Sequence, residues 1–94
     1  MKHFAWNSEK NDQLIREREI SFERVIYQIE RDGLLDVISH PNSSKYPNQK
    51  MFIVDIGGYA YLVPFIENEA EIFLKTIIPS RKATRKYIEV SDES

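Results

Sequence analysis

Apolar and polar residues alternate with a helical period in the first third of the chain. After Ser21, four apolar residues lie at positions i, i+3, i+4 and i+7: Phe22, Val25, Ile26 and Ile29. This spacing predicts a helix that buries one face, with Ser21 as its N-cap and Gly33 in the position directly after its C-cap. An earlier helix is expected from Asn7, its cap, to about residue 18, with Leu14 and Ile15 pointing inward.

From residue 49 onward the apolar period changes to two, which is typical of strands. Residues 51–56 and 59–66 have this strand pattern, and Gly57 and Gly58 separate the two segments. This arrangement predicts a hairpin with a two-residue turn. Residues 71–78 form the last expected strand. Pro79 ends it because proline donates no ladder hydrogen bond.

Two further segments complete the expected fold. Residues 34–39 form a short strand or extended segment, and Ser80 caps a short basic C-terminal helix. The chain is therefore expected to be a single α+β domain over residues 1–94. Two N-terminal helices would pack on an antiparallel sheet of about four strands.

The expected strands are apolar on both faces. The N-terminal helices can cover one face, and the other must meet the C-terminal helix, form a groove or be buried by another chain. We interpret this surplus as a sign of a protein partner. The alternative is that residues 80–88 cover the second face alone.

Composition narrows the class of protein. The chain has 94 residues, no cysteine and two histidines, so disulfides and thiolate metal sites are excluded and no metal or cofactor is expected. No run approaches the roughly 20 apolar residues of a membrane span, and the N-terminus lacks the apolar core of a signal peptide. We expect a cytoplasmic protein without a membrane partner.

Charge is distributed unevenly around a formal net value of −2. Residues 72–88 contain no acid but five cations: Lys75, Arg81, Lys82, Arg85 and Lys86. Residues 37–54 also lack acids and contain Lys45, Lys50 and His40. The local electric field of such segments, rather than the net charge of the chain, governs the encounter with a polyanion. These segments therefore predict an anionic partner such as a nucleic acid.

Three motifs resemble the BrnT-type toxins of the RelE-like superfamily, the ribonuclease half of bacterial type II toxin-antitoxin pairs. They are Phe4-Ala5-Trp6-Asn7, Ile20-Ser21-Phe22-Glu23 and Ile77-Ile78-Pro79-Ser80-Arg81-Lys82-Ala83-Thr84. The resemblance spans nearly the whole chain, and the last motif is the most specific. Where many members have tyrosine-glycine-glutamate-x-arginine, this chain has Tyr46-Pro47-Asn48-Gln49-Lys50, which keeps the tyrosine and a cation but lacks the guanidinium.

The resemblance implies an endoribonuclease that cleaves RNA without metal and inhibits translation. A ribose 2′-hydroxyl would attack the adjacent phosphate, which requires a proton acceptor, cations at the phosphate and a proton donor for the leaving oxygen. The candidate catalytic residues are Lys50, Arg81, Arg85, His40 and Tyr46. The candidate substrate-binding residues are Lys45, Lys75, Lys82 and Lys86. Lys50 would face the arginines across a groove.

The resemblance also implies partners. These are a cognate antitoxin of the ribbon-helix-helix type, RNA either free or on the ribosome, and operator DNA only through the antitoxin. The alternative function is a non-catalytic, degenerate RNA-binding or protein-interaction module.

Several candidate residues also have structural readings. His40 before a proline suits a turn, and Tyr46 suits an aromatic that anchors its loop. Lys50 suits a solvated strand end. Lys75 either marks the open face of the groove or protects a sheet edge.

Overall fold

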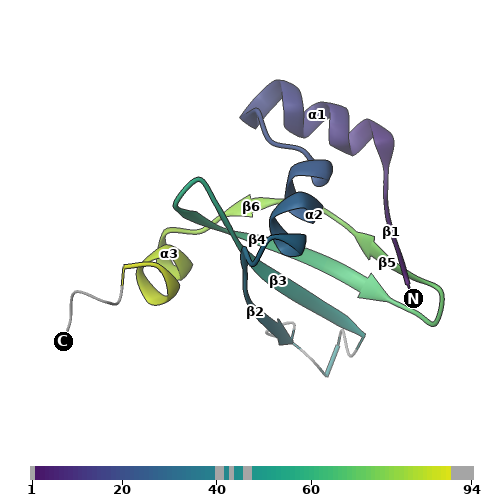
Figure 1. Cartoon of the computed structure of the whole chain (residues 1–94). Coiled ribbons are helices and arrows are strands. Elements are labelled where there is room, and N and C mark those ends of the chain that lie inside the picture. The colour runs from purple at the N-terminus through teal and green to yellow at the C-terminus, as the bar shows by residue number, and fades with distance from the viewer. Residues whose placement is uncertain (1, 40–41, 43, 46–47, 90–94) are drawn as a thin grey trace.

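The computed structural model describes residues 2–39, 42, 44–45 and 48–89 (Figure 1). These residues form an α+β fold with three helices and one six-stranded sheet. The elements in chain order are β1 (His3–Trp6), α1 (Ser8–Arg18), α2 (Phe22–Glu30), β2 (Leu34–Ser39), β3 (Gln49–Ile56), β4 (Tyr59–Glu67), β5 (Glu71–Leu74), β6 (Ile78–Pro79) and α3 (Arg81–Tyr87). The described part of the chain contains no helix of the length and apolarity that a membrane crossing requires.

The sheet is mixed rather than antiparallel. Its strand order is β1-β5-β4-β3-β2, and β6 pairs with β4 beyond the end of β5. The strand pair β1–β5 is parallel and the other pairs are antiparallel. The predicted α+β class and the central hairpin are thus confirmed. The prediction of about four antiparallel strands missed strands of the sheet and the parallel pairing of β1 with β5.

The expected strand over residues 71–78 is divided into β5 and β6. The division lies beside Pro64, whose carbonyl accepts a hydrogen bond of 2.8 Å from the Lys75 backbone N–H. In an antiparallel ladder the N–H and C=O of one residue point to the same side. Proline lacks the N–H that would continue the ladder there, so regular pairing stops on this side of β4.

Strand β1 is the element that the sequence did not predict. Its four residues pair in parallel with β5, with Phe4 opposite Ile72 and Trp6 opposite Leu74. Trp6 also stacks on Phe22 of α2, with ring centroids 5.8 Å apart. The N-terminal strand thereby joins the far edge of the sheet to the helices.

The helix starts agree with the sequence prediction, but the end of α2 differs. Asn7 and Ser21 accept hydrogen bonds from Lys10 and Arg24 backbone N–H groups, as N-caps do. After α2, Asp32 adopts the left-handed conformation with φ 70°. The next residue, Gly33, donates its N–H to the Gln28 carbonyl at 2.6 Å.

Glycine at position 33 is therefore explained by close approach rather than by positive φ. A Cβ on Gly33 would lie 2.7 Å from the Gln28 carbonyl oxygen. This pattern is a Schellman-type ending with the left-handed residue one position earlier than predicted.

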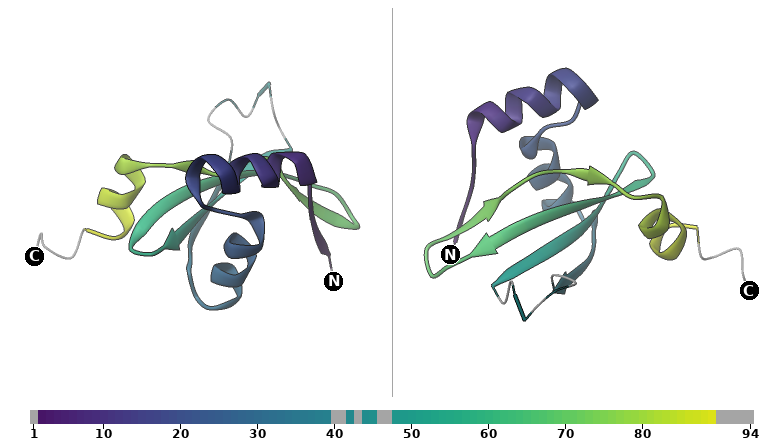
Figure 2. Two further views of the ribbon diagram at one scale, coloured as in Figure 1. Left: turned by 90° about the horizontal axis from the view of Figure 1, so that it is seen from above. Right: turned by 180° about the vertical axis from the view of Figure 1, so that it is seen from behind.

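The two faces of the sheet carry different cores. Leu14 of α1 and Phe22 and Val25 of α2 pack on the face formed by alternate residues of the central strands, including Phe52 and Phe65. The opposite face carries a smaller cluster of Ile53, Ala60 and Ala83. Both views of Figure 2 place α3 at the end of the molecule away from the N-terminus.

Candidate functional site

Helix α3 is fixed to the start of β4 by its own polar side chains. Ser80 caps the helix and accepts a hydrogen bond of 3.0 Å from the Ala83 N–H. Thr84 is buried, and its hydroxyl oxygen accepts from the Ala60 N–H at 2.9 Å. The same hydroxyl donates to the Ser80 carbonyl at 2.8 Å. The sequence Ser-x-x-Ala-Thr thus sets the position of the basic helix.

The four cations of α3 are exposed and lie in two pairs. Arg81 and Arg85 are one turn apart, as are Lys82 and Lys86, so each pair shares a face of the helix. Within the described part of the chain no salt bridge joins any of the four to an acid. The helix therefore presents net positive charge to solvent.

An open cavity of about 220 Å³ lies between α3 and the face of the sheet opposite α1 and α2. We call it the α3 groove. Its floor is aliphatic: Ile38, Ile53, Leu62 and Ala83. Lys82 and Lys86 of α3 also line it, whereas Arg81 and Arg85 do not. The two cationic faces of α3 thus have different surroundings.

Tyr87 closes one side of the α3 groove. Its hydroxyl donates a hydrogen bond of 2.6 Å to the Asp36 carboxylate on β2. This bond lowers the pKa of Asp36, with smaller contributions from the Val37 backbone N–H and from Lys86. The same bond raises the pKa of Tyr87. The contact holds the end of α3 to the edge strand of the sheet.

Lys50 does not lie across the groove from the arginines. It pairs with Phe65, a core residue of the face covered by α1 and α2, so it belongs to that face. Helix α3 instead packs at Ala60, five residues earlier on β4, over the opposite face. The sequence-based arrangement of Lys50 facing the arginine pair is therefore wrong, because the register of β3 decides the face.

Lys50 instead neighbours an acid. Its Nζ lies 3.8 Å from Glu67 Oε1, and Lys2 forms a second ion pair with the same carboxylate. The hydrogen bond from Lys2, and to a lesser extent the charge of Lys50, hold the pKa of Glu67 below its usual value. Such a paired, partly exposed lysine suits a structural role at the strand end.

The remaining predicted site residues are dispersed. Lys75 is exposed in the connection between β5 and β6, and Lys45 is exposed in the loop before β3, where its N–H donates to the Asn42 carbonyl. His40 and Tyr46 lie outside the described residues. Among the residues that the structure describes, no group of histidine and acidic side chains could hold a metal ion.

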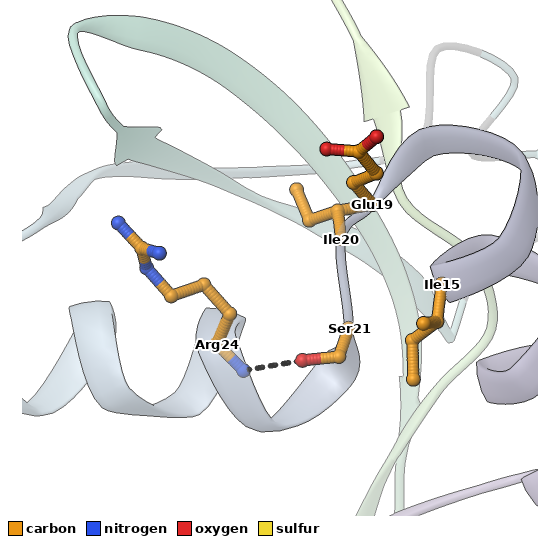
Figure 3. Close-up of a pocket in the computed structure, with 5 residues that line it drawn as sticks. All are labelled: Ile15, Glu19, Ile20, Ser21 and Arg24. Atoms are coloured by element: carbon orange, nitrogen blue, oxygen red, sulfur yellow. Dashed lines mark hydrogen bonds between the residues drawn. The ribbon is translucent and has the colours of Figure 1, made fainter.

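A second cavity, of about 460 Å³, opens between the end of α1 and the start of α2 (Figure 3). It is lined by Ile15, Glu19, Ile20, Ser21 and Arg24. Ile15 is 46 % exposed there, although the helical pattern predicted that it points inward. The cavity contains none of the predicted site residues.

Sequence reasoning missed Asp36, Tyr87 and the aliphatic floor of the α3 groove. Tyr87 follows Ala83 by four residues, so the helical period could have placed both on one face. Ile38 and Leu62 could not be assigned to that face before the strand register was known.

Comparison with known proteins adds no relative. No protein-family model, no curated protein and no solved structure matches the chain. The functional interpretation therefore depends on the chain's own residues and their arrangement.

Proposed function

We propose that this protein is the toxin of a bacterial type II toxin-antitoxin pair, an endoribonuclease of BrnT type with a RelE-like fold. The observation that carries the proposal is the exposed pair Arg81 and Arg85 on α3, one turn apart and without an acid in the surrounding segment. The motif that contains them is also the most specific point of resemblance to that family.

The arginine pair suits an RNA phosphate. Guanidinium groups stay protonated and offer forked donors that match phosphate oxygens. Cations at this place would stabilise the charge that develops when a ribose 2′-hydroxyl attacks the adjacent phosphorus and the 5′-oxygen leaves. Arg81 and Arg85 are therefore assigned to phosphate binding in the transition state.

Proton transfer is assigned by chemistry to His40 and Tyr46. Tyr87 and Asp36 beside α3 are poor candidates for this role, because their hydrogen bond lowers the pKa of the acid and raises that of the phenol. Both shifts move these groups away from neutrality, where a general acid or base is most effective.

The proposed partners follow from the same assignment. A small ribbon-helix-helix antitoxin would bind the protein and block it, and operator DNA would be reached only through that antitoxin. RNA, free or on the ribosome, would be the substrate.

Growth arrest on induced expression tests the proposal. The variant Arg81→Glu/Arg85→Glu is expected to abolish arrest. A matched control is Arg16→Glu/Arg24→Glu, which makes the same charge change at exposed positions of α1 and α2. Both variants should give the circular dichroism of the wild type. Unchanged arrest by the folded α3 variant contradicts the proposal.

A second function is favoured by one observation. Lys50 lies on the other face of the sheet from the arginine pair, so the expected cation opposite Arg81 is missing. A degenerate toxin that binds RNA or a protein without cleaving RNA would need no such cation. RNA binding without any cleavage by the purified chain would identify this alternative.

A further inference from the structure

Helix α3 separates its cations into two chemically different environments. Lys82 and Lys86 border the aliphatic α3 groove, while Arg81 and Arg85 lie outside it. An anion that bound the arginines alone would leave the lysines and the groove open. The lysine face therefore requires a separate explanation.

The size and lining of the α3 groove favour side chains of a protein. Its volume of about 220 Å³ is below the roughly 300–1,000 Å³ of small-molecule sites. The floor consists of aliphatic groups from four elements, including Ile38 of β2 and Leu62 of β4. Such a surface is the usual complement of a few apolar side chains on one face of a helix.

RNA bases fit this lining less well. Proteins hold unstacked bases on aromatic rings and on the planes of arginine side chains. In the described structure the α3 groove has one aromatic residue, Tyr87, whose hydroxyl is held by Asp36, and both arginines of α3 lie outside it.

We infer that the α3 groove docks a protein segment that carries aliphatic side chains beside carboxylates. The aliphatic side chains fill the floor, and the carboxylates meet Lys82 and Lys86, which have no salt bridge within the described chain. Naming the segment as part of the antitoxin rests on the proposed function. Docking itself depends only on the groove.

This docking explains how a partner could block RNA without competing for each arginine contact. A segment seated between the lysines lies beside Arg81 and Arg85 on the same short helix. Its carboxylates would reduce the local positive field, and its bulk would cover the approach to the phosphate-binding face.

A display library of short random peptides, selected on the immobilised full-length chain, tests the docking. Enriched peptides are expected to combine Leu, Ile or Val with Asp or Glu. Their affinity for the variant Lys82→Glu/Lys86→Glu should be about tenfold lower or more. Each substitution replaces a lysine that attracts a peptide carboxylate at the surface by a glutamate that repels it. Association should also slow when salt is raised.

A matched pair of variants on β2 separates apolar docking from general charge attraction. Ile38 lines the groove, whereas its neighbour Val37 is 45 % exposed and pairs with Phe52 of the helix-covered face. Ile38→Gln should weaken the enriched peptides by about tenfold. Val37→Gln should leave their affinity unchanged.

Three results would overturn the inference. The first is enrichment of peptides without acids or no enrichment at all, and the second is equal binding to wild type and to the groove variants. The third is an NMR competition experiment in which a short RNA oligonucleotide displaces the bound peptide and itself shifts the resonances of Ile38 and Leu62. That result would assign the groove to RNA. RNA cleavage by the isolated chain is measured without peptide, so failure of the peptide to bind leaves the proposed function standing. Failure of RNA cleavage, in turn, leaves the docking inference standing.

Discussion

The two faces of the sheet differ in what covers them. On the face under α1 and α2, large apolar side chains are closed off from water, as in the stacked Phe52 and Phe65 rings 4.0 Å apart. On the other face, Ala60 and Ala83 allow α3 to approach closely, and the aliphatic surface beside them stays open. The first face thus supplies stability, and the second leaves surface for a partner.

The largest effect expected from this difference is on stability. Phe22 of α2 is fully buried in the core between the helices and the sheet, and Leu62 is partly exposed beside α3. Phe22→Ala should lower the free energy of unfolding by about 3–5 kcal/mol, because it leaves a cavity, and Leu62→Ala by about 1–2 kcal/mol. Urea denaturation measures both. Equal losses would show that the two faces are equally packed.

The polar contacts of the helix-covered face should come next. Buried Asn11 accepts from the Phe22 N–H at 2.8 Å and donates to Glu23 at 2.9 Å. Asn11→Ala leaves that N–H without its side-chain partner and should cost about 1–3 kcal/mol. The exposed cap Asn7 is the comparison, since Asn7→Ala should cost about 1 kcal/mol. A larger loss at Asn7 would contradict this order.

A smaller effect is expected where α3 meets the sheet. Thr84→Val removes the oxygen that accepts from the Ala60 N–H, whereas Thr84→Ser keeps it. The valine variant should lose about 1 kcal/mol, near the lower limit for an unmet hydrogen bond, because valine has the same shape as threonine and leaves no cavity. Hydrogen exchange of the Ala60 amide should rise in the valine variant alone. Equal exchange in both variants would show that this bond does not fix α3.

The smallest effect concerns pH at the same helix. The pKa of Asp36 is lowered, so the Tyr87 contact is present above the usual Asp value and is lost as pH falls through the lower folded pKa. The pKa of Tyr87 is raised, so the contact persists below 10.0 and is lost as pH rises through the folded pKa. Amide protection in α3 should follow this window, and Tyr87→Phe should remove it. A pH dependence that survives in Tyr87→Phe would assign it to other groups.

Local signals in the sequence predicted the local elements well. Asn7, Ser21 and Ser80 each accept a hydrogen bond from the N–H three residues later, so the cap identities alone gave the starts of all three described helices. The pair Gly57 and Gly58, both with positive φ, gave the central hairpin.

Features that depend on distant residues were not predicted. Strand β1 forms only because β5 offers a free edge, and the division between β5 and β6 depends on Pro64 of the neighbouring strand. The face of Lys50 depends on its pairing with Phe65. A shift of one residue in that register would have moved Lys50 to the side of α3. The sequence therefore predicted the basic helix α3 but not the face of the sheet on which Lys50 lies.

RNA cleavage by the purified chain in the presence of a metal chelator tests the central claim most directly. The account predicts fragments that end in a 2′,3′-cyclic phosphate, because the attacking group is the ribose 2′-hydroxyl. It also predicts cleavage at least ~100-fold slower for folded Arg81→Ala, the usual cost of removing one group that stabilises transition-state charge. Absence of cleavage by the wild type on free RNA and on ribosome-bound RNA alike, or undiminished cleavage by the folded Arg81→Ala variant, would contradict the account.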